Sequence, residues 1–293
     1  MCGCCTGLSG SLCFLRTSCC VRQLPQCSRD SVLLVAMALL TFTSLILLLQ
    51  PSVATALICT RVSGRMRQID ASNGQVYGVG LNNRGYTWVG GHWMLLAETG
   101  ALAHISVGPA GVWAVGTGQE LYRMVEGRWA ILAGLLSQVD TGGNQIVVGV
   151  DSERQVFCSN RRAAISAGNF SGPAYSQLPG RLRYYSCGPR TCWGIAASGT
   201  TQVRLGVRPQ HCVGSRWRRV PSSMVMVEVA SDGSVYAVDS SGEVFRRAGI
   251  AHSNLVGTHW KRVHILGRRF RHVTADLGAL WLIERNFNVV HCR

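Results

Sequence analysis

The sequence predicts an all-β fold, a six-bladed β-propeller with four strands in each blade. The first supporting observation is a short apolar motif that occurs six times, with its second position at residues 77, 113, 148, 193, 236 and 281. The second is that other strand motifs recur in step with it, and the third is that the two ends of the chain complement each other. A period of about 35 to 45 residues is typical of solenoids and propellers, and four-stranded units favour the propeller.

Each repeat contains four strand motifs. The first alternates apolar and polar residues, at 66–69, 102–105, 182–185, 226–229 and 270–273. The second is the apolar motif, whose composition suits a strand buried on both faces. The third follows at 121–123, 156–158 and 244–246, and a tryptophan opens the fourth: Trp93, Trp129, Trp217 and Trp260. Glycine, aspartate and asparagine separate the strands, as tight turns require.

The ends of the chain predict how the ring closes. The sixth repeat stops at Arg293, after its third strand, and a spare strand precedes the first repeat at 58–62. We expect this N-terminal strand to complete the last blade, because closure leaves no open sheet edge at the seam. The arrangement would bring Cys59 close to Cys292.

The first 36 residues form a segment rich in cysteine, with seven cysteines and no clear strand or helix pattern. It can be interpreted as a palmitoylated tail ahead of a membrane anchor. A zinc module is a weaker interpretation, because the segment has no paired CxxC and no histidine. We favour a third, that residues 1–36 are an upstream extension outside the mature protein.

Residues 37–56 are expected to be a signal peptide. Met37 starts an apolar run that reaches Leu49, and a small-residue site at 54–56 follows Pro51, so we expect cleavage after Ala56. A membrane anchor at 32–49 is the alternative, because about 18 residues of helix nearly span a bilayer core. Under either interpretation residues 57–293, the propeller, face the outside, and we favour a secreted protein.

The six cysteines after residue 56 are expected to form disulfides, as an even number does in an exported domain. The strand exchange predicts Cys59–Cys292, and Cys187–Cys192 would bridge a short turn. Cys158 and Cys212, in neighbouring blades, then remain for each other. Asn169, in the single Asn-x-Ser/Thr sequence, is a candidate for glycosylation.

Segments 59–70 and 73–79 resemble the opening of the fish-egg lectins, and 186–194 is similar to a cysteine turn of the same proteins. The repeat, with its closing Trp-x-x-Val/Leu, resembles the tectonin repeat over about residues 57–293. Blade three departs from it, with Tyr175 in place of the tryptophan, and so does the third strand of blade one at 86–88. The resemblance implies binding of N-acetylglucosamine and bacterial lipopolysaccharide, and a role in innate defence.

No catalytic motif is recognisable: the sequence has no HExxH, GxSxG or P-loop. The acidic residues Asp70, Asp151 and Asp239 are interpreted as turn or strand-end residues. We therefore expect no enzyme, no catalytic residue and no cofactor, and the sequence leaves the use of calcium open.

The turns between second and third strands hold the candidate glycan-binding residues. Such turns share one rim of a propeller, and asparagine, aspartate and glutamate side chains suit sugar hydroxyls. The candidates are Asn82, Asn83, Glu120, Asp151, Asp239, Glu243 and Asn286. The competing interpretation is that tight turns need these residues. Trp88 is added as an aromatic side chain expected to be exposed, whereas the repeated tryptophans are expected to pack between blades.

Positive charge is the remaining signal. The chain carries a formal +15, with Lys261 its single lysine, and removal of 1–56 leaves 26 basic against 13 acidic residues, or +13. Arg268, Arg269 and Arg271 are candidates for binding polyanions, because arginine pairs well with phosphate and sulfate. A solvated surface is the competing interpretation. Export argues against nucleic acid as a partner.

The sequence thus favours a secreted lectin that binds glycans such as N-acetylglucosamine, or lipopolysaccharide, on microbial or egg surfaces. The alternative is an interaction scaffold, membrane-anchored or secreted, that binds acidic glycans or proteins.

Overall fold

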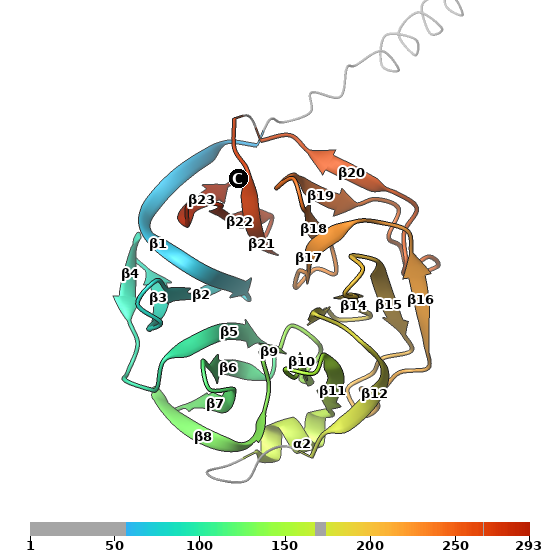
Figure 1. The fold of residues 1–293 in the computed structure, drawn as a ribbon, viewed down its shortest axis with the longest axis horizontal. Helices are drawn as coiled ribbons and strands as arrows, with labels where there is room; N and C mark the ends of the chain where they lie inside the picture. The colour runs from blue at the N-terminus through green and yellow to red at the C-terminus, as the bar shows by residue number, and fades with distance from the viewer. Residues whose placement is uncertain (1–56, 168–173, 266) are drawn as a thin grey trace, which may run out of the picture. The chain divides into compact units, whose positions relative to one another are not determined.

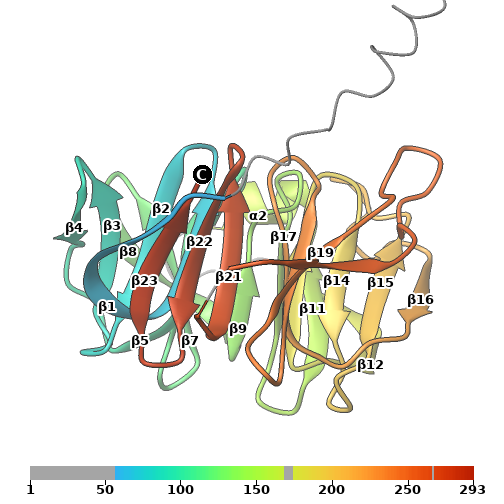
Figure 2. The same ribbon diagram turned by 90° about the horizontal axis from the view of Figure 1, so that it is seen from above.

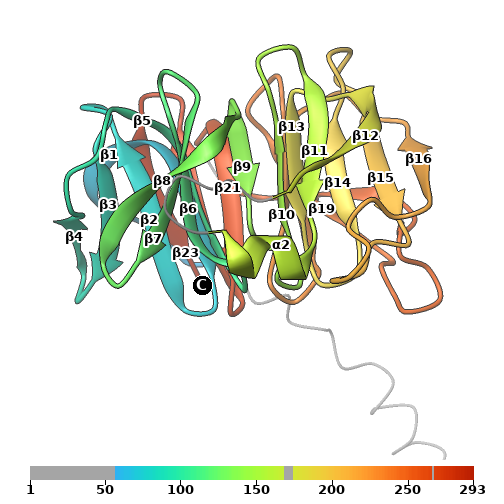
Figure 3. The same ribbon diagram turned by 90° about the horizontal axis from the view of Figure 1, so that it is seen from below.

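The computed structural model describes residues 57–167, 174–265 and 267–293. They form six blades around a central axis, each a twisted antiparallel sheet of four strands (Figure 1). Figures 2 and 3 show the strands running between the two rims of the ring. The predicted signal peptide, the 32–49 segment and Asn169 lie outside the described residues. Within those residues, no helix is long and apolar enough to cross a membrane.

In each of the first three blades, the strands follow one another from the centre of the ring outward. Blade one consists of the end of β1 (Cys59–Ser72) with β2 (Gln75–Gly80), β3 (Gly85–Val89) and β4 (His92–Leu95). Blade two consists of β5 (Leu102–Gly108), β6 (Gly111–Gly116), β7 (Glu120–Val125) and β8 (Arg128–Leu135). Blade three consists of β9 (Gln138–Asp140), β10 (Val147–Val150), β11 (Gln155–Ser159) and β12 (Ser176–Arg181), and the short helix α2 (Arg161–Ser166) follows β11.

The second half of the ring repeats the plan. Blade four consists of β13 (Tyr184–Cys187), β14 (Cys192–Ile195), β15 (Thr201–Leu205) and β16 (Arg216–Val220). Blade five consists of β17 (Met224–Val229), β18 (Val235–Asp239), β19 (Val244–Arg247) and β20 (Trp260–Val263). Blade six consists of β21 (Phe270–Asp276), β22 (Ala279–Glu284), β23 (Asn288–Cys292) and the start of β1.

Strand β1 closes the ring as predicted. Its first residues pair with β23, from Cys59 opposite Cys292 to Arg65 opposite Asn288. Its last residues pair with β2, so one strand belongs to blade six and then to blade one. The structure also contains the three predicted disulfides, Cys59–Cys292, Cys158–Cys212 and Cys187–Cys192.

The core lies between the blades, where the apolar second strands pack. All four residues of β14 are buried, and so are all six of β22. Trp113 of β6 is fully buried against residues from blades two and three, including Leu132 and Val147. Trp193 lies 5.9 Å from Trp260, ring centre to ring centre. Trp113 and Trp193 therefore lie in the core. The repeated tryptophans are half-buried and pack against it: Trp93, Trp129, Trp217 and Trp260.

The innermost strands carry a polar ring that the sequence analysis misinterpreted. Asp70 does lie near the end of β1, but it is buried there, and its Oδ2 accepts the Val107 N–H of blade two at 2.8 Å. Asp140 accepts the Cys187 N–H of blade four in the same way, at 2.9 Å. These bonds join blades side by side because the acceptor and the donor belong to neighbouring blades.

The ring has a pseudo-threefold pattern. Blades one, three and five present Asp70, Asp140 and Glu228, and blades two, four and six present a hydroxyl at the equivalent position: Ser106, Ser186 and Thr274. Each hydroxyl accepts an N–H of the next blade, from Thr141, Val229 and Ala71 respectively. Buried polar groups cost little when hydrogen-bonded, so these bonds can join neighbouring blades at the centre of the ring.

Candidate functional site

The turns between second and third strands share one face of the ring, here called the 2–3 rim. The structure confirms this shared face and shows what the turns do. Each turn has one residue with positive φ whose carbonyl accepts an N–H at the start of the next blade's first strand. These residues are Asn83, Gln119, Arg154, Gly199, Gly242 and Phe287. The turns are therefore links between blades.

Most candidate side chains on the 2–3 rim stabilise their own turns. Oδ1 of Asp151 accepts the Gln155 N–H at 2.8 Å, and Oδ1 of Asp239 accepts the Glu243 N–H at 2.9 Å. Asn286 accepts the Asn288 N–H in the same manner. Their types thus follow from turn chemistry. Glu120, at the start of β7, is half-buried.

Trp88 was expected to be exposed and is half-buried instead. Its ring lies 5.1 Å from Trp93 and 5.5 Å from Trp281, centre to centre, in edge-to-face contact. Such pairs stabilise packing beyond simple burial. Trp88 therefore belongs to the packing of blade one against blade six.

The predicted polyanion cluster is largely engaged within the protein. Arg268 forms an ion pair with Glu284 at 2.7 Å, and Arg269 forms one with Glu243 at 2.9 Å. The Arg271 guanidinium lies over the Phe287 ring, 4.6 Å from its centre. A bound anion would have to compete with these carboxylates, which weakens the case for this cluster.

One predicted residue does line a hollow on the 2–3 rim. A cavity of about 320 Å³ lies beside Asn82, Tyr86 and Trp93. Gly64 also borders it, at a φ of +92°, and a Cβ there would lie 2.8 Å from the Trp93 ring. The hollow combines aromatic walls with an amide, but the Asn82 amide already donates to the Tyr86 hydroxyl at 2.9 Å.

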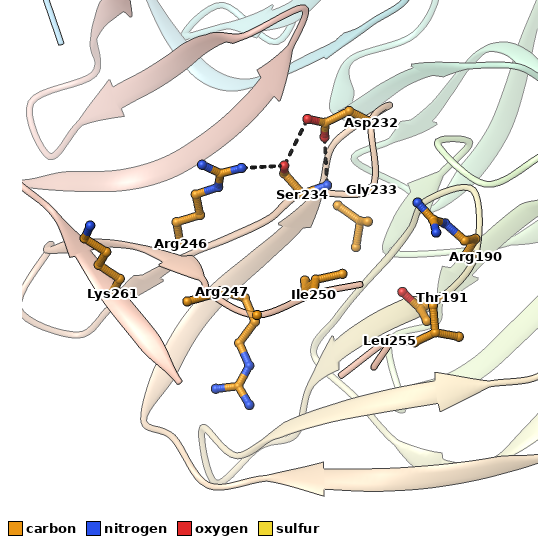
Figure 4. A pocket seen from close by; sticks show the side chains of 13 residues that line it. Arg190, Thr191, Asp232, Gly233, Ser234, Arg246, Arg247, Ile250, Leu255 and Lys261 are labelled. Carbon is orange, nitrogen blue, oxygen red and sulfur yellow. Dashed lines mark hydrogen bonds between the residues drawn. The ribbon is translucent and has the colours of Figure 1, made fainter. Parts of the chain in front are cut away.

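A second cavity, of about 340 Å³, lies on the opposite rim between blades four and five and is here called the blade 4/5 pocket (Figure 4). Its polar lining includes Arg190, Asp232, Ser234, Arg246 and Lys261, and its apolar lining includes Ile250 and Leu255. None of these residues was among the predicted glycan-binding residues. The pocket lies on the rim of the 1–2 and 3–4 connections, because antiparallel strands send alternate turns to opposite ends.

A ten-residue loop at 249–258 forms one wall of the pocket. It repeats the pattern of the loop at 206–215 in blade four, and glycines with positive φ stand at corresponding positions in both. Nε of Arg247 donates to the Val256 carbonyl at 2.9 Å, and its guanidinium lies over Trp260. In blade four, Nε of Arg204 donates to the Val213 carbonyl, and its guanidinium lies over Trp217. A buried arginine thus holds each loop rigidly.

The two loops differ at one informative position. Cys212 of the first loop is tied by a disulfide to Cys158 of blade three, and the loop's Pro209 carbonyl accepts the Arg161 N–H from helix α2. Leu255 occupies the corresponding position of the second loop and borders the blade 4/5 pocket. Comparison of these two loops in the sequence could have indicated the pocket.

The polar groups of the pocket are ordered by hydrogen bonds. Asp232 accepts the Ser234 N–H at 2.7 Å and the Ser234 hydroxyl at 2.9 Å. Arg246 donates to the same hydroxyl at 3.1 Å, and its guanidinium lies over the Tyr236 ring. A carboxylate, a hydroxyl and arginine donors beside an apolar wall are the combination that binds small polar ligands in pockets.

Within the described part of the chain, no group of three or more His, Cys, Asp or Glu side chains is placed to hold a metal ion.

The fold and the repeat define a β-propeller built from tectonin-type blades. The chain belongs to the tectonin family: the tectonin domain model matches residues 65–285. It is also 39% identical to the fish-egg lectin of the carp Cyprinus carpio over 235 residues, which cover 80% of this chain and 98% of that lectin.

Solved structures agree on the fold alone. Human WBSCR16 superposes with a TM-score of 0.51 at 12% identity, over 78% of this chain and 72% of that chain. The Cps50 (Swd1) β-propeller domain of Myceliophteria thermophila gives a TM-score of 0.51 at 10% identity, over 78% and 83% of the two chains.

Proposed function

We propose that this protein is a secreted lectin whose main glycan site is the blade 4/5 pocket. The observation that carries the proposal is the pocket's lining, with Asp232, Ser234 and Arg246 ordered by hydrogen bonds beside an apolar wall. The relation to the carp fish-egg lectin supports carbohydrate as the ligand class. We propose N-acetylglucosamine-type glycans or lipopolysaccharide, on microbial or egg surfaces, as the targets, in innate defence.

The pocket's chemistry suits a saccharide ring. Asp232 can accept hydrogen bonds from sugar hydroxyls, and the arginine can donate to ring or hydroxyl oxygens. Ile250 and Leu255 offer an apolar surface to the carbon face of the ring. A cavity of about 340 Å³ is at the lower end of the range for small-ligand sites, which fits one or two sugar units.

The hollow beside Asn82, Tyr86 and Trp93 is a secondary candidate. It lies on the opposite rim, so one ring could contact a repetitive glycan surface from either face. Because the two sites lie on opposite rims, they could raise the apparent affinity only by bridging two glycan chains or two surfaces, not by binding one surface together.

A glycan array probed with the wild type and with Asp232→Asn tests the proposal. The substitution removes the carboxylate that accepts sugar hydroxyls, so binding to neutral glycans should fall at least tenfold. Glu126→Gln is the matched control, because it removes the same charge from an exposed 3–4 turn of blade two, on the same rim.

The array also distinguishes a lectin from the alternative, an interaction scaffold. A lectin should be competed by free sugar. An interaction scaffold for acidic glycans or proteins should instead resist free sugar and lose binding as salt rises, because screening weakens contacts between exposed charges. That second pattern, or equal losses in the two variants, would contradict the lectin proposal.

A further inference from the structure

We propose that the blade 4/5 pocket selects a saccharide that carries a tetrahedral oxyanion, a phosphate or sulfate monoester, bound by Arg246, Lys261 and Arg190. This inference rests on the proposed function and names the ligand class of the same site. Figure 4 shows Arg190 on one side of the pocket and the other two cations across from it.

The first argument is a pair of like charges. Arg246 of β19 and Lys261 of β20 are direct cross-strand partners. Like charges directly opposite each other destabilise a sheet. The equivalent cross-strand positions in the other blades never join two cations: Thr87 with Met94, Arg123 with Ala130, Cys158 with Ser176, Val203 with Arg218, and His291 with Thr60. Among the six blades, only blade five has two cations at this cross-strand position, and both line the blade 4/5 pocket.

The second argument is that these cations have no carboxylate partner in the described residues. The five ion pairs found there leave out Arg190, Arg246 and Lys261. Arg262, the next residue after Lys261, does have a partner, Glu243 at 2.6 Å. The single carboxylate of the pocket lining, Asp232, is engaged by Ser234. Three exposed cations therefore line a pocket whose single carboxylate forms no ion pair with any of them.

The third argument is preorganisation. One amino group of Arg246 is held by the Ser234 hydroxyl, and the flat guanidinium lies over Tyr236, 5.9 Å from its centre. The remaining guanidinium donors are free to pair with an oxyanion as a fork, and such charge-assisted bonds are strong and directional. Less side-chain freedom is then lost on binding.

Arg190 is positioned from the other blade by a rigid turn. The disulfide between Cys187 and Cys192 closes this turn, and Gly188 N–H donates to the Thr191 carbonyl at 2.9 Å. The Thr191 hydroxyl also accepts the Trp193 indole N–H at 3.1 Å. Blades four and five thus each contribute cations from ordered backbone, and an oxyanion between them would offset the repulsion within blade five.

The test compares three probes by calorimetry: N-acetylglucosamine, its 6-phosphate and its 6-sulfate. The wild-type protein should bind at least one charged probe ten or more times tighter than the neutral sugar, and the two charged probes distinguish phosphate from sulfate. Equal affinity for all three would overturn this inference and leave the lectin proposal intact. Absence of binding by any saccharide, here and on the array, would count against the lectin proposal itself.

Two variants localise the effect. Lys261→Gln should reduce the preference for the charged probe over the neutral sugar at least threefold, measured as the ratio of the two affinities. Arg218→Gln is the matched control, because it removes the same charge from an exposed residue at the equivalent position of blade four. If both variants reduce the preference equally, general charge attraction explains it and the assignment to the pocket is wrong.

Discussion

Cys59 and Cys292 lie directly opposite each other on β1 and β23 and form a disulfide, although 233 positions separate them in the chain. The bond secures the strand that completes blade six and then enters blade one. The ring is thereby closed by backbone pairing and by a covalent bond at the same seam.

Removal of this disulfide should destabilise the protein and leave glycan binding intact. Chain-entropy estimates give about 5 kcal/mol for a loop of this length. In the Cys59→Ser, Cys292→Ser double variant we expect a lower melting temperature by calorimetry, with unchanged glycan specificity because the blade 4/5 pocket is elsewhere in the ring. An unchanged melting temperature, or non-reducing peptide maps that pair Cys59 with another cysteine, would contradict this.

Charge reversal at Arg268 should act through stability. Its guanidinium contacts the Glu284 carboxylate, which also pairs with Arg61. Burial acts to raise the pKa of Glu284, but bonds from Asn288 and Arg268 and the charge of Arg61 hold it below the usual value. Arg268→Glu should therefore lower the free energy of unfolding by about 1.5 to 3 kcal/mol, as for hydrogen bonds to charged groups.

Urea unfolding measures this effect, with Arg216→Glu as a control on an exposed strand residue. If Arg268→Glu keeps the wild-type free energy of unfolding but binds lipopolysaccharide more weakly, the arginines at 268–271 form a polyanion site after all.

The polar ring predicts an unusual pH dependence of stability. Burial first, and then the nearby Asp70 charge, raise the pKa of Asp140 to about 8. A carboxyl that holds its proton more tightly when folded makes stability fall as pH rises from the unfolded pKa toward the folded pKa. The buried His104 and His272, whose pKa values burial lowers, are neutral in the folded protein, so they oppose this fall near pH 7, where unfolded histidine is about one quarter protonated, and no longer do so near pH 8.

Asp140→Asn tests the pH dependence because the amide oxygen can still accept the N–H groups of Cys187 and Gly142. Between pH 7 and 8 the wild type should lose stability at up to about 1.4 kcal/mol per pH unit for one proton, and the variant should show a flatter profile. Asp232→Asn, at an exposed position, should keep the wild-type slope. Parallel profiles for Asp140→Asn and wild type would refute the role of this carboxyl.

Processing of the N-terminus remains a prediction from the sequence. Protein made from Met1 in a secretory cell should be recovered from the medium with Leu57 at or near its N-terminus. N-terminal sequencing of the secreted material provides the measurement. An intact N-terminus retained in the membrane fraction would favour the anchor at 32–49.

The fold was predictable because strand motifs are local. Alternating residues around Tyr77 or Trp113 mark buried strands, and their period counts the blades. The function of single polar residues was less accessible, because their partners belong to other blades. From the sequence, Asp70 resembles an ordinary strand-end residue, because its partner Val107 belongs to blade two. Arg269 likewise resembles a free surface cation, because its partner Glu243 belongs to blade five.

The pocket was missed for a related reason. Its cations come from separate segments, with Arg190 in a turn of blade four and Lys261 in a strand of blade five. The candidates chosen from turn composition alone, such as Asp151 and Asp239, are turn-forming residues. Residue type on a rim therefore indicates turn chemistry more directly than it indicates a binding site.

A crystal structure of the protein with an N-acetylglucosamine oligomer tests the central claim most directly. We predict sugar density in the blade 4/5 pocket, with hydroxyls within hydrogen-bond distance of Asp232 and a ring face against Ile250 or Leu255. Sugar bound only at the 2–3 rim, or an empty pocket at saturating oligomer, would contradict the proposed site.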